Sequence, residues 1–532
     1  MNFDLTTKPW VPVVTQDGLY REVSLLELFA QWDTLRELQA DNPPTTLALH
    51  RFLLALLHWV YEGPEDEEDW ESIRDDNGAE VITYLKEHQD CFDLLHLDHP
   101  FMQDPTLTVD VAGEIYQAYV LHGNNTSTVF CHEHQWSGDS LDIAAAARLV
   151  LRLHVFDVGG RKTGSSVSAG VIPTMDAANV LVCGNSLKET LLLNLMQYDG
   201  EEKPFEGNGE DLPAWEREPQ PAQERVPTGY VDYLTFQWRR VRLFFEGNRA
   251  VKVAVHPGDR LPKSHSPADY EIAIAYKKNP KKPGDRYTIR LDLNRSLWRD
   301  STAFLQSSGK WSEAWIGPKI ITWIAELQQA KLVPDWLNLQ VLGLTVDNAK
   351  PLSWVNEQLS VPTAYVTEKP LWQALDSALQ FAEKHKDVFM SFQGSPYYVL
   401  AEGLNPPGTP KKAISQQAAQ LASTLGGSSR YWTALDQQFK ELLHKKLPDP
   451  KDKTVSGNGT IYGFQALQDW EKAVHSTAAK AFTESISSIR NYQARAKALN
   501  SLNHHLDRLG SDKNTSGKSK KQKTSSKSSA RR

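Results

Sequence analysis

Hydrophobic and polar residues follow one another along this chain in two different rhythms. Between Ser24 and Met196 several segments repeat apolar residues every three or four positions, and the same spacing returns at residues 312–329 and from about Thr363 to Leu509. Between Val231 and Leu297 apolar and polar residues alternate one by one. The first rhythm is typical of amphipathic helices and the second of strands with one solvated face. The pattern predicts an α+β fold, in which a large mixed N-terminal domain with a β-rich section precedes a C-terminal helical bundle.

Local signals indicate the limits of individual elements. The turn Gln16-Asp17-Gly18 predicts short strands on either side of it, and Ser24 is a suitable N-cap for the helix that follows. We expect helices over residues 24–31, 45–62, 66–87, 141–153, 187–196, 312–329, 370–390, 411–445 and 463–508. We expect strands over residues 235–245, 250–256, 270–278, 287–293 and 337–346. The expected organisation is a domain over residues 1–360, a helical bundle over 361–510 and a tail over 511–532.

Charge is distributed unevenly along the chain. The formal net charge is −8, yet the Lys/Ser-rich tail from Ser511 to Arg532 holds eight Lys or Arg and one Asp. Residues 239–299 are also basic, whereas residues 62–90 are acidic. Segregated charge allows an acidic protein to carry a local nucleic-acid surface, and a solvated polar surface is the alternative interpretation. The composition of the tail predicts disorder.

Neither a membrane segment nor a disulfide framework is predicted. No apolar run approaches the roughly 20 residues that a membrane span needs, and the N-terminus lacks a signal-peptide pattern. The three cysteines, Cys91, Cys131 and Cys183, are far apart in the sequence, which suits a reducing compartment. We expect a cytoplasmic protein without a membrane partner.

The run from His154 to Gly164, HVFDVGGRKTG, is the strongest candidate for a binding loop. Gly159 and Gly160 lack a Cβ, so another molecule can approach their main chain closely, and Arg161 and Lys162 supply positive charge. The spacing fits neither a P-loop nor a dinucleotide-binding fingerprint. The run therefore indicates either a surface for an anionic partner or a tight loop with solvated charges.

No reaction can be assigned from the sequence. The dense group His122, Cys131, His132, Glu133 and His134 lacks the spacing of a zinc-protease motif, and no nucleophile elbow is present. We therefore expect no catalytic residues, no cofactor and no bound metal. A metal-dependent hydrolase that uses the region His132–His134 stays open as an alternative, as does a scaffold that binds RNA nonspecifically through the basic tail.

Several segments together resemble one protein family. These segments are Lys8-Pro9-Trp10-Val11-Pro12-Val13, Ser24-Leu25-Leu26-Glu27-Leu28-Phe29, His99-Pro100-Phe101-Met102-Gln103, Gly159-Gly160-Arg161-Lys162-Thr163-Gly164, His265-Ser266-Pro267 and Leu297-Trp298-Arg299-Asp300. In order and spacing they resemble the CasA family, the large subunit of the type I-E CRISPR surveillance complex, Cascade. The helical C-terminus is similar to the four-helix bundle of that family, and only the basic tail lies outside the resemblance.

The resemblance implies a non-enzymatic DNA-recognition subunit. Such a subunit reads the protospacer-adjacent motif (PAM) of duplex target DNA from the minor groove, assists strand opening and R-loop formation, and helps to recruit the helicase-nuclease. The implied partners are target double-stranded DNA, the Cascade subunits that hold the guide RNA, and the helicase-nuclease effector. Guide pairing then supplies the sequence choice.

The resemblance also assigns roles to individual residues. Gly159, Gly160 and Lys162 correspond to the glycine loop of the family, and Lys252 resembles its minor-groove lysine. Asp347 and Asn348 match the tip of the strand-separating wedge, where the usual family pattern is Asn followed by Gln. Phe130, in the loop 124–136, matches an aromatic position at the guide end or PAM region. Ordinary roles remain open: an exposed strand lysine for Lys252, a β-turn for the wedge and a loop anchor for Phe130.

Overall fold

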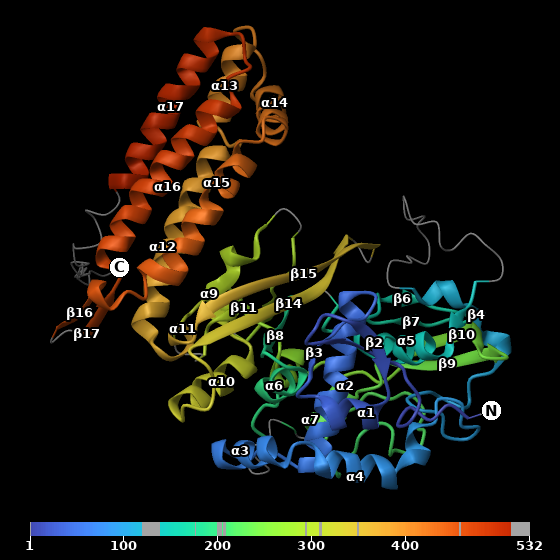
Figure 1. The fold of residues 1–532 in the computed structure, drawn as a ribbon. Coiled ribbons are helices and arrows are strands. Elements are labelled where there is room, and N and C mark those ends of the chain that lie inside the picture. Colours follow the sequence, from blue (N-terminus) through green and yellow to red (C-terminus); the bar gives the residue numbers. More distant parts are fainter. Residues whose placement is uncertain are drawn as a thin grey trace, which may run out of the picture. The chain divides into compact units, whose positions relative to one another are not determined.

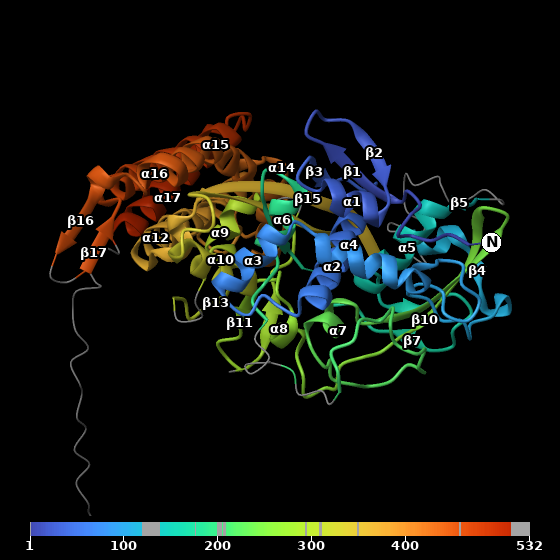
Figure 2. The ribbon, with the colours of Figure 1, turned by 60° about the horizontal axis from the view of Figure 1, so that its bottom comes forward.

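Helices and several small sheets are interspersed along the chain (Figures 1 and 2). The computed structural model describes residues 2–119, 139–175, 177–198, 205, 209–282, 284–292, 295–307, 311–347, 350–456 and 459–511. The predicted α+β fold class is confirmed, because strands and helices alternate in the first two thirds and helices dominate the last third. The tail beyond Ser511 lies outside the described residues.

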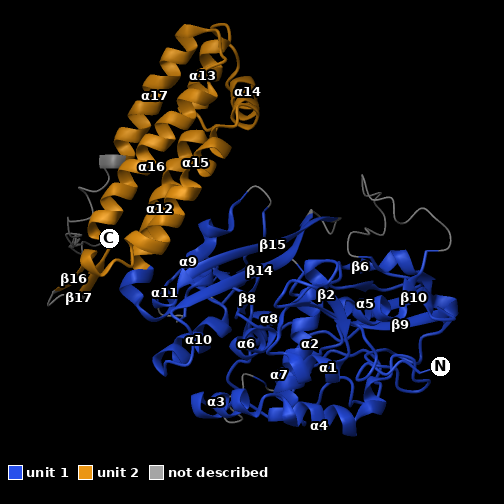
Figure 3. Cartoon of the chain, viewed as in Figure 1, with its two compact units in different colours: residues 1–372 blue, residues 373–532 orange. Residues whose placement is uncertain are grey.

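The chain divides into two compact units, Met1–Trp372 and Gln373–Arg532 (Figure 3). The division falls inside α12 (Lys369–His385), the first long helix of the C-terminal region. The helices of the first unit, besides those described below, are α3 (Glu67–Asp76), α4 (Ala79–Glu87), α6 (Leu187–Leu193), α7 (Tyr230–Leu234), α8 (Pro267–Tyr270), α9 (Ser301–Phe304), α10 (Lys319–Gln329) and α11 (Ala364–Thr367).

The N-terminal elements form where the sequence predicts them. Strands β1 (Val11–Thr15) and β2 (Tyr20–Val23) pair antiparallel around the predicted turn, and β3 (Leu35–Leu38) adds to the other edge of β1. Helix α1 (Leu25–Gln31) begins with a complete capping box, in which the Ser24 side chain accepts from the Glu27 N–H and Glu27 accepts from the Ser24 N–H. This arrangement satisfies two backbone donors that the helix itself leaves unpaired.

Helix α2 (Pro43–Tyr61) lies in the core of the first unit, where every residue from Pro43 to His58 is buried. The sequence predicts only a broad apolar face, and the structure buries the polar positions as well. Arg51 forms an ion pair of 2.7 Å with Glu271, and His58 bonds to the Gly63 carbonyl. Buried polar groups of this kind need such partners.

Two of the predicted strands are much shorter than expected. In place of residues 270–278 and 287–293, the structure has β11 (Tyr276–Lys278) and β12 (Arg286–Thr288), which form a sheet with β13 (Trp315–Ile316). The prediction of one solvated face was wrong for residues 270–276, because all of them are buried. Their alternation of Ala and Ile reflects small and large residues in the core. The helix expected from residue 312 begins only at Lys319, after Pro318.

Two antiparallel ribbons of the first unit carry the predicted site residues. One ribbon joins β9 (Arg239–Glu246) to β10 (Arg249–Pro257), and β4 (Gly113–Glu114) and β5 (Leu141–Asp142) pair with the other edge of β10. The second ribbon joins β14 (Trp336–Asp347) to β15 (Lys350–Pro362), and β8 (Asn179–Cys183) pairs with β14. The apolar face of the first ribbon packs on α5 (Ile143–Val155).

The second unit is built from long helices. These are most of α12, then α13 (Pro396–Leu404), α14 (Lys411–Thr424), α15 (Gly427–Glu441), α16 (Phe464–Ser485) and α17 (Tyr492–Ser511). Helix α13 packs on α14 and α17, and α15 packs on α16. The prediction that helices dominate this region is confirmed, but each of the helices expected over residues 411–445 and 463–508 is divided in two, into α14 and α15 and into α16 and α17. The sequence reasoning also missed α13 and the hairpin of β16 (Lys453–Ser456) and β17 (Gly459–Tyr462).

Candidate nucleic-acid interface

The glycine run folds into a small hairpin directly after α5. Strand β6 (Gly160–Arg161) pairs antiparallel with β7 (Ser168–Ala169). Gly160 has a φ of +124°, and a Cβ added there would meet no atom within 4 Å. Only glycine adopts this backbone conformation readily. Gly159 differs, because its added Cβ would lie 3.1 Å from Val171 Cγ2 and 3.2 Å from the Ala169 carbonyl oxygen. Gly160 therefore presents open main chain, whereas Gly159 permits the two strands to pack closely.

A buried charge cluster holds this hairpin from beneath. Asp157 Oδ1 accepts from Lys162 Nζ at 2.9 Å, and its Oδ2 accepts from Arg239 Nε at 2.6 Å. Arg239 also donates to the Gly170 carbonyl at 2.8 Å, which ties β9 to the end of β7. Burial acts to raise the pKa of Asp157, but the charges of Lys162 and Arg239 outweigh it and hold that pKa below its ordinary value.

Lys162, which the sequence analysis expects to contact DNA, is buried in the structure. Its side chain is only 6% exposed, and its ammonium group is bonded to Asp157. Burial lowers the pKa of Lys162 despite the attraction of Asp157. A group this buried, whose charge is already paired, supports the loop and does not reach a partner in this conformation. Asp157 is only five residues from Lys162, but the sequence does not show that this pair is buried together with Arg239, 82 residues away from Asp157.

Lys252 lies on β10, opposite Phe244 of β9, at an irregularity where Val251 has no partner in the register. Such β-bulges redirect side chains and occur frequently near functional sites. Lys252 is half-buried and forms no ion pair with any residue that the structure describes. On its other side β10 pairs with β4, where Glu114 stands opposite Lys252.

The glycine hairpin and the lysine strand are bonded to each other. The Val255 N–H of β10 donates to Thr163 Oγ1 at 2.7 Å. Thr163 therefore bonds to β10 just beyond the residues that pair with β4. Gly113 of β4 must also be small, since an added Cβ would lie 2.8 Å from Thr163 Cγ2. Lys252 is three residues from Val255, about 10 Å along an extended strand. This hydrogen bond brings the hairpin of Gly160 to the strand of Lys252, although 92 positions separate Thr163 from Val255 in the sequence.

The hairpin of β14 and β15 ends at the predicted wedge. Asp347 is the last residue of β14 and pairs with Lys350, the first of β15, while Asn348 lies outside the described residues. The segment between β7 and β8 connects the glycine hairpin to this ribbon. Gly343 of β14 packs against that segment so closely that an added Cβ would lie 2.6 Å from the Ala177 carbonyl oxygen. Strands β14 and β15 thus pair as far as Asp347 and Lys350, and the wedge role of Asp347 and Asn348 stays a prediction.

Phe130 and the loop 124–136 lie outside the described residues, as does the group from His122 to His134. Within the parts of the chain that the structure does describe, no three His, Cys, Asp or Glu side chains are arranged to hold a metal ion. In the same parts, no helix combines the length and hydropathy that a membrane crossing requires.

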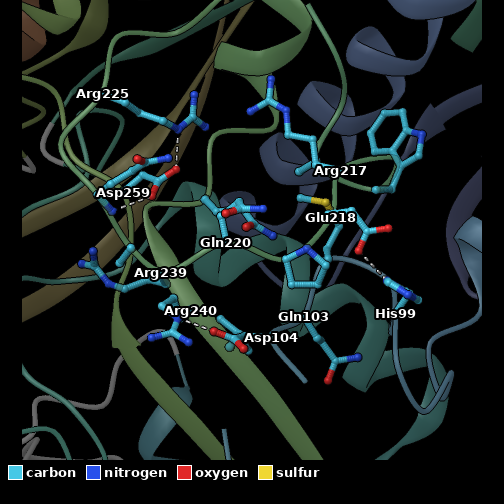
Figure 4. Close-up of a pocket in the computed structure, with 18 of the residues that line it drawn as sticks. His99, Gln103, Asp104, Arg217, Glu218, Gln220, Arg225, Arg239, Arg240 and Asp259 are labelled. Atoms are coloured by element: carbon cyan, nitrogen blue, oxygen red, sulfur yellow. Dashed lines mark hydrogen bonds and ion pairs between the residues drawn. The ribbon is translucent and has the colours of Figure 1, made fainter. Parts of the chain in front are cut away.

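A polar cavity of about 540 Å³ is lined in part by Arg239, Arg240 and Val241 at the start of β9 (Figure 4). The segment from His99 to Asp104, the loop 209–228 and Asp259 line it. The four arginines among its described lining residues are all paired: Arg217 with Asp232, Arg225 with Asp232 and Asp259, Arg239 with Asp157, and Arg240 with Asp104. Because these carboxylates neutralise the arginines, the cavity offers less attraction to a phosphate than the surface of β10.

Comparison with known proteins identifies the family. A family model described as "CRISPR-associated protein Cse1" matches residues 4–481, most of the chain. The chain belongs to this Cse1 family. A curated relative, "CRISPR-associated protein CasA/Cse1" of Thermus thermophilus, is 29% identical over 456 residues, which cover 82% of this chain and 86% of the relative. The resemblance inferred from the sequence motifs is confirmed.

Solved structures of Cse1 proteins share the fold. A crystal structure of Thermus thermophilus CasA has a TM-score of 0.76 at 24% identity, covering 96% of this chain and 100% of the other. Thermobifida fusca Cse1 has a TM-score of 0.73 at 24% identity, with coverage of 95% and 96%. A chain of a structure described as a "CRISPR RNA-guided surveillance complex" has a TM-score of 0.73 at 20% identity, with coverage of 96% and 100%.

Proposed function

We propose that this Cse1-family chain is the non-catalytic DNA-recognition subunit of a type I-E CRISPR surveillance complex. It reads the PAM of duplex target DNA from the minor groove, assists strand opening and R-loop formation, and helps to recruit the helicase-nuclease. Its partners are the target duplex, the guide-RNA-containing subunits and that effector, and it acts in the cytoplasm. Family membership and the similarity to a chain of an RNA-guided surveillance complex support this proposal.

One observation carries the proposal: the hydrogen bond between Thr163 and Val255 joins the glycine hairpin to the strand of Lys252. The minor groove of DNA is only about 6 Å wide, and its edges offer mainly acceptors. Open main chain at Gly160 can approach a narrow groove where a side chain would collide. Lys252 then supplies a donor for the base or sugar acceptors, and its charge favours the DNA.

The other predicted residues either support the glycine hairpin or contact the target at other points. Lys162 keeps the glycine hairpin in place through Asp157, and Gly159 permits its close packing. Asn348, with Asp347 beside it at the hairpin turn, separates the first base pair of the target. Phe130 stacks on a base or ribose near the guide end.

The test uses the complex assembled from all its subunits and a guide RNA. Binding to a target duplex is measured with the matching PAM and with a scrambled PAM. We expect Lys252→Ala and Gly160→Asp each to lower the preference for the PAM by about 5- to 150-fold, because each removes or blocks one minor-groove contact, about 1–3 kcal/mol. Asn348→Ala should slow R-loop formation, measured by permanganate reactivity of the displaced strand, and leave initial duplex binding intact.

Controls separate this function from its alternatives. Arg36→Gln removes an exposed charge from β3, in a different sheet, and should leave the preference for the PAM unchanged. Melting temperatures of the free variants show whether Gly160→Asp folds. If Lys252→Ala and a folded Gly160→Asp retain full PAM preference, the proposed reading surface is wrong. Stoichiometric metal in the purified protein would favour a hydrolase, and loss of all nucleic-acid binding on deletion of residues 511–532 would favour an RNA scaffold.

A further inference from the structure

The outer face of the β9–β10 ribbon is unusually basic. Residues that stand opposite each other in an antiparallel pair share one face, and the register pairs Arg240 with His256, Arg242 with Ala254 and Phe244 with Lys252. The intervening residues Val241, Leu243, Val253 and Val255 are buried on the other face. Three cations and a histidine therefore project from the same side of a two-stranded ribbon.

Two of these basic side chains already have defined partners. Arg240 is bonded to Asp104 and also donates to Thr106 Oγ1 at 2.7 Å, so its charge is neutralised within the fold. Burial lowers the pKa of His256, although its hydrogen bond to the backbone of Thr163 acts in the opposite direction. At neutral pH, Arg242 and Lys252 are therefore the charged side chains on this face that have no ion-pair partner among the described residues.

Arg242 has no hydrogen bond or ion pair with any residue that the structure describes. Its Nη1 is nevertheless fully shielded from solvent. Burial lowers the pKa of Arg242, and Asp104 opposes that effect only from a distance, since Asp104 is bonded to Arg240. A shielded charged donor without an acceptor is costly, because folding removes its water and supplies nothing in return. Arg242 as a whole is only half-buried, and it projects from the outer face of the ribbon, so the exposed part of the residue can meet a partner.

We propose that Arg242 binds a backbone phosphate of the target duplex beside the PAM and so positions the groove against Gly160 and Lys252. The inference rests on the proposed function and adds a second, sequence-independent contact to the same surface. Arg242 stands opposite Ala254, two residues from Lys252, and diagonal neighbours on adjacent strands are about 7–8 Å apart. Two long side chains at that separation can engage one duplex together.

The chemistry of the side chain favours a phosphate. A guanidinium is planar and presents paired N–H donors that match two phosphate oxygens. Phosphate contacts fix the register of a protein on DNA and carry no sequence information. Because the chain as a whole has a formal net charge of −8, nearby DNA is not held by general attraction, and unpaired local cations are needed.

The test measures the assembled, guide-loaded complex on PAM and scrambled-PAM duplexes at several salt concentrations. Arg242→Gln should weaken binding to both duplexes by about tenfold, and the slope of log K against log salt should become shallower by about 0.9. The preference for the PAM should remain. Arg242→Lys keeps the charge without the paired donors, so it should recover the salt slope and only part of the affinity. Arg36→Gln, a loss of one exposed charge on β3, is the matched control.

Stability gives an independent readout. Arg242→Met should not lower the melting temperature of the free protein, since the arginine contributes no bond within the part of the fold that the structure describes. A lower melting temperature by several degrees would show that Arg242 is structural and would overturn the inference. Unchanged affinity and salt slope for Arg242→Gln would also overturn it, and loss of bound guide RNA would assign the phosphate to RNA instead of DNA. If Lys252→Ala still abolishes PAM preference in these cases, the proposed function stands without Arg242.

Discussion

The buried cluster beneath the glycine hairpin allows a quantitative prediction. In Asp157→Asn the side-chain shape is retained, but the negative charge that pairs with both Lys162 and Arg239 is lost. Asp157 is 8% exposed and the Arg239 side chain 2%, so water cannot replace the carboxylate. Removing one partner of a buried ion pair costs roughly 3–5 kcal/mol. Since Lys162 already has a lowered pKa and can release its proton, we expect the lower end, about 3 kcal/mol.

Calorimetry of the free protein measures this loss. The unfolding entropy is about 2.1 cal/mol/K per residue, or roughly 0.8 kcal/mol/K for a unit of 372 residues. A loss of about 3 kcal/mol therefore lowers the melting temperature of this unit by about 4 °C. The loop above the cluster should also lose order, so hydrogen exchange at residues 159–170 should accelerate, and PAM preference should decline with it.

A surface pair provides the control. Asp75 is 68% exposed and bonds to Arg74 at 3.0 Å, so Asp75→Asn should change the melting temperature by less than about 1 °C. Acid should act on the wild type in the same direction as Asp157→Asn. Because the pKa of Asp157 is depressed in the fold, the stability from its charge is present above the unfolded pKa and is lost as pH falls through the folded pKa. An Asp157→Asn protein that melts within about 1 °C of wild type would refute this reasoning.

Three further predictions concern stability. Burial lowers the pKa of His50, His58 and His154 to about 4, so on acidification these histidines gain protons in the unfolded chain before they do in the fold. The free energy of unfolding should therefore fall between about pH 6.5 and 4, by up to roughly 3 kcal/mol per histidine. Melting curves across this range measure the loss, and a melting temperature that does not change with pH would contradict it. Gly343→Ala places a Cβ 2.5 Å from Leu291 Cδ1, so it should cost about 1–3 kcal/mol in calorimetry, whereas Gly170→Ala, with open space, should cost far less. Ser24→Ala removes the N-cap of α1 and should cost about 1 kcal/mol; full stability would mean that the cap is redundant.

The sequence by itself determined the classes of element and many of their limits. The N-cap at Ser24, the turn before β2 and the alternation of β9 and β10 are local signals, and the structure confirms each of them. Motifs in their order along the chain also sufficed to identify the family. Local signals succeed because helix caps, turns and one-sided strands depend on residues only a few positions apart.

Tertiary structure alone decided what the individual side chains do. Lys162, which the sequence presents as an exposed cation, is buried against Asp157, and the same carboxylate also binds Arg239 from a strand 82 residues away. Arg242 looks like any other polar residue of a solvated strand face, and only the packing around it reveals a shielded donor without an acceptor among the described residues. Burial and charge pairing depend on which distant segments meet in space, and no local pattern encodes that information.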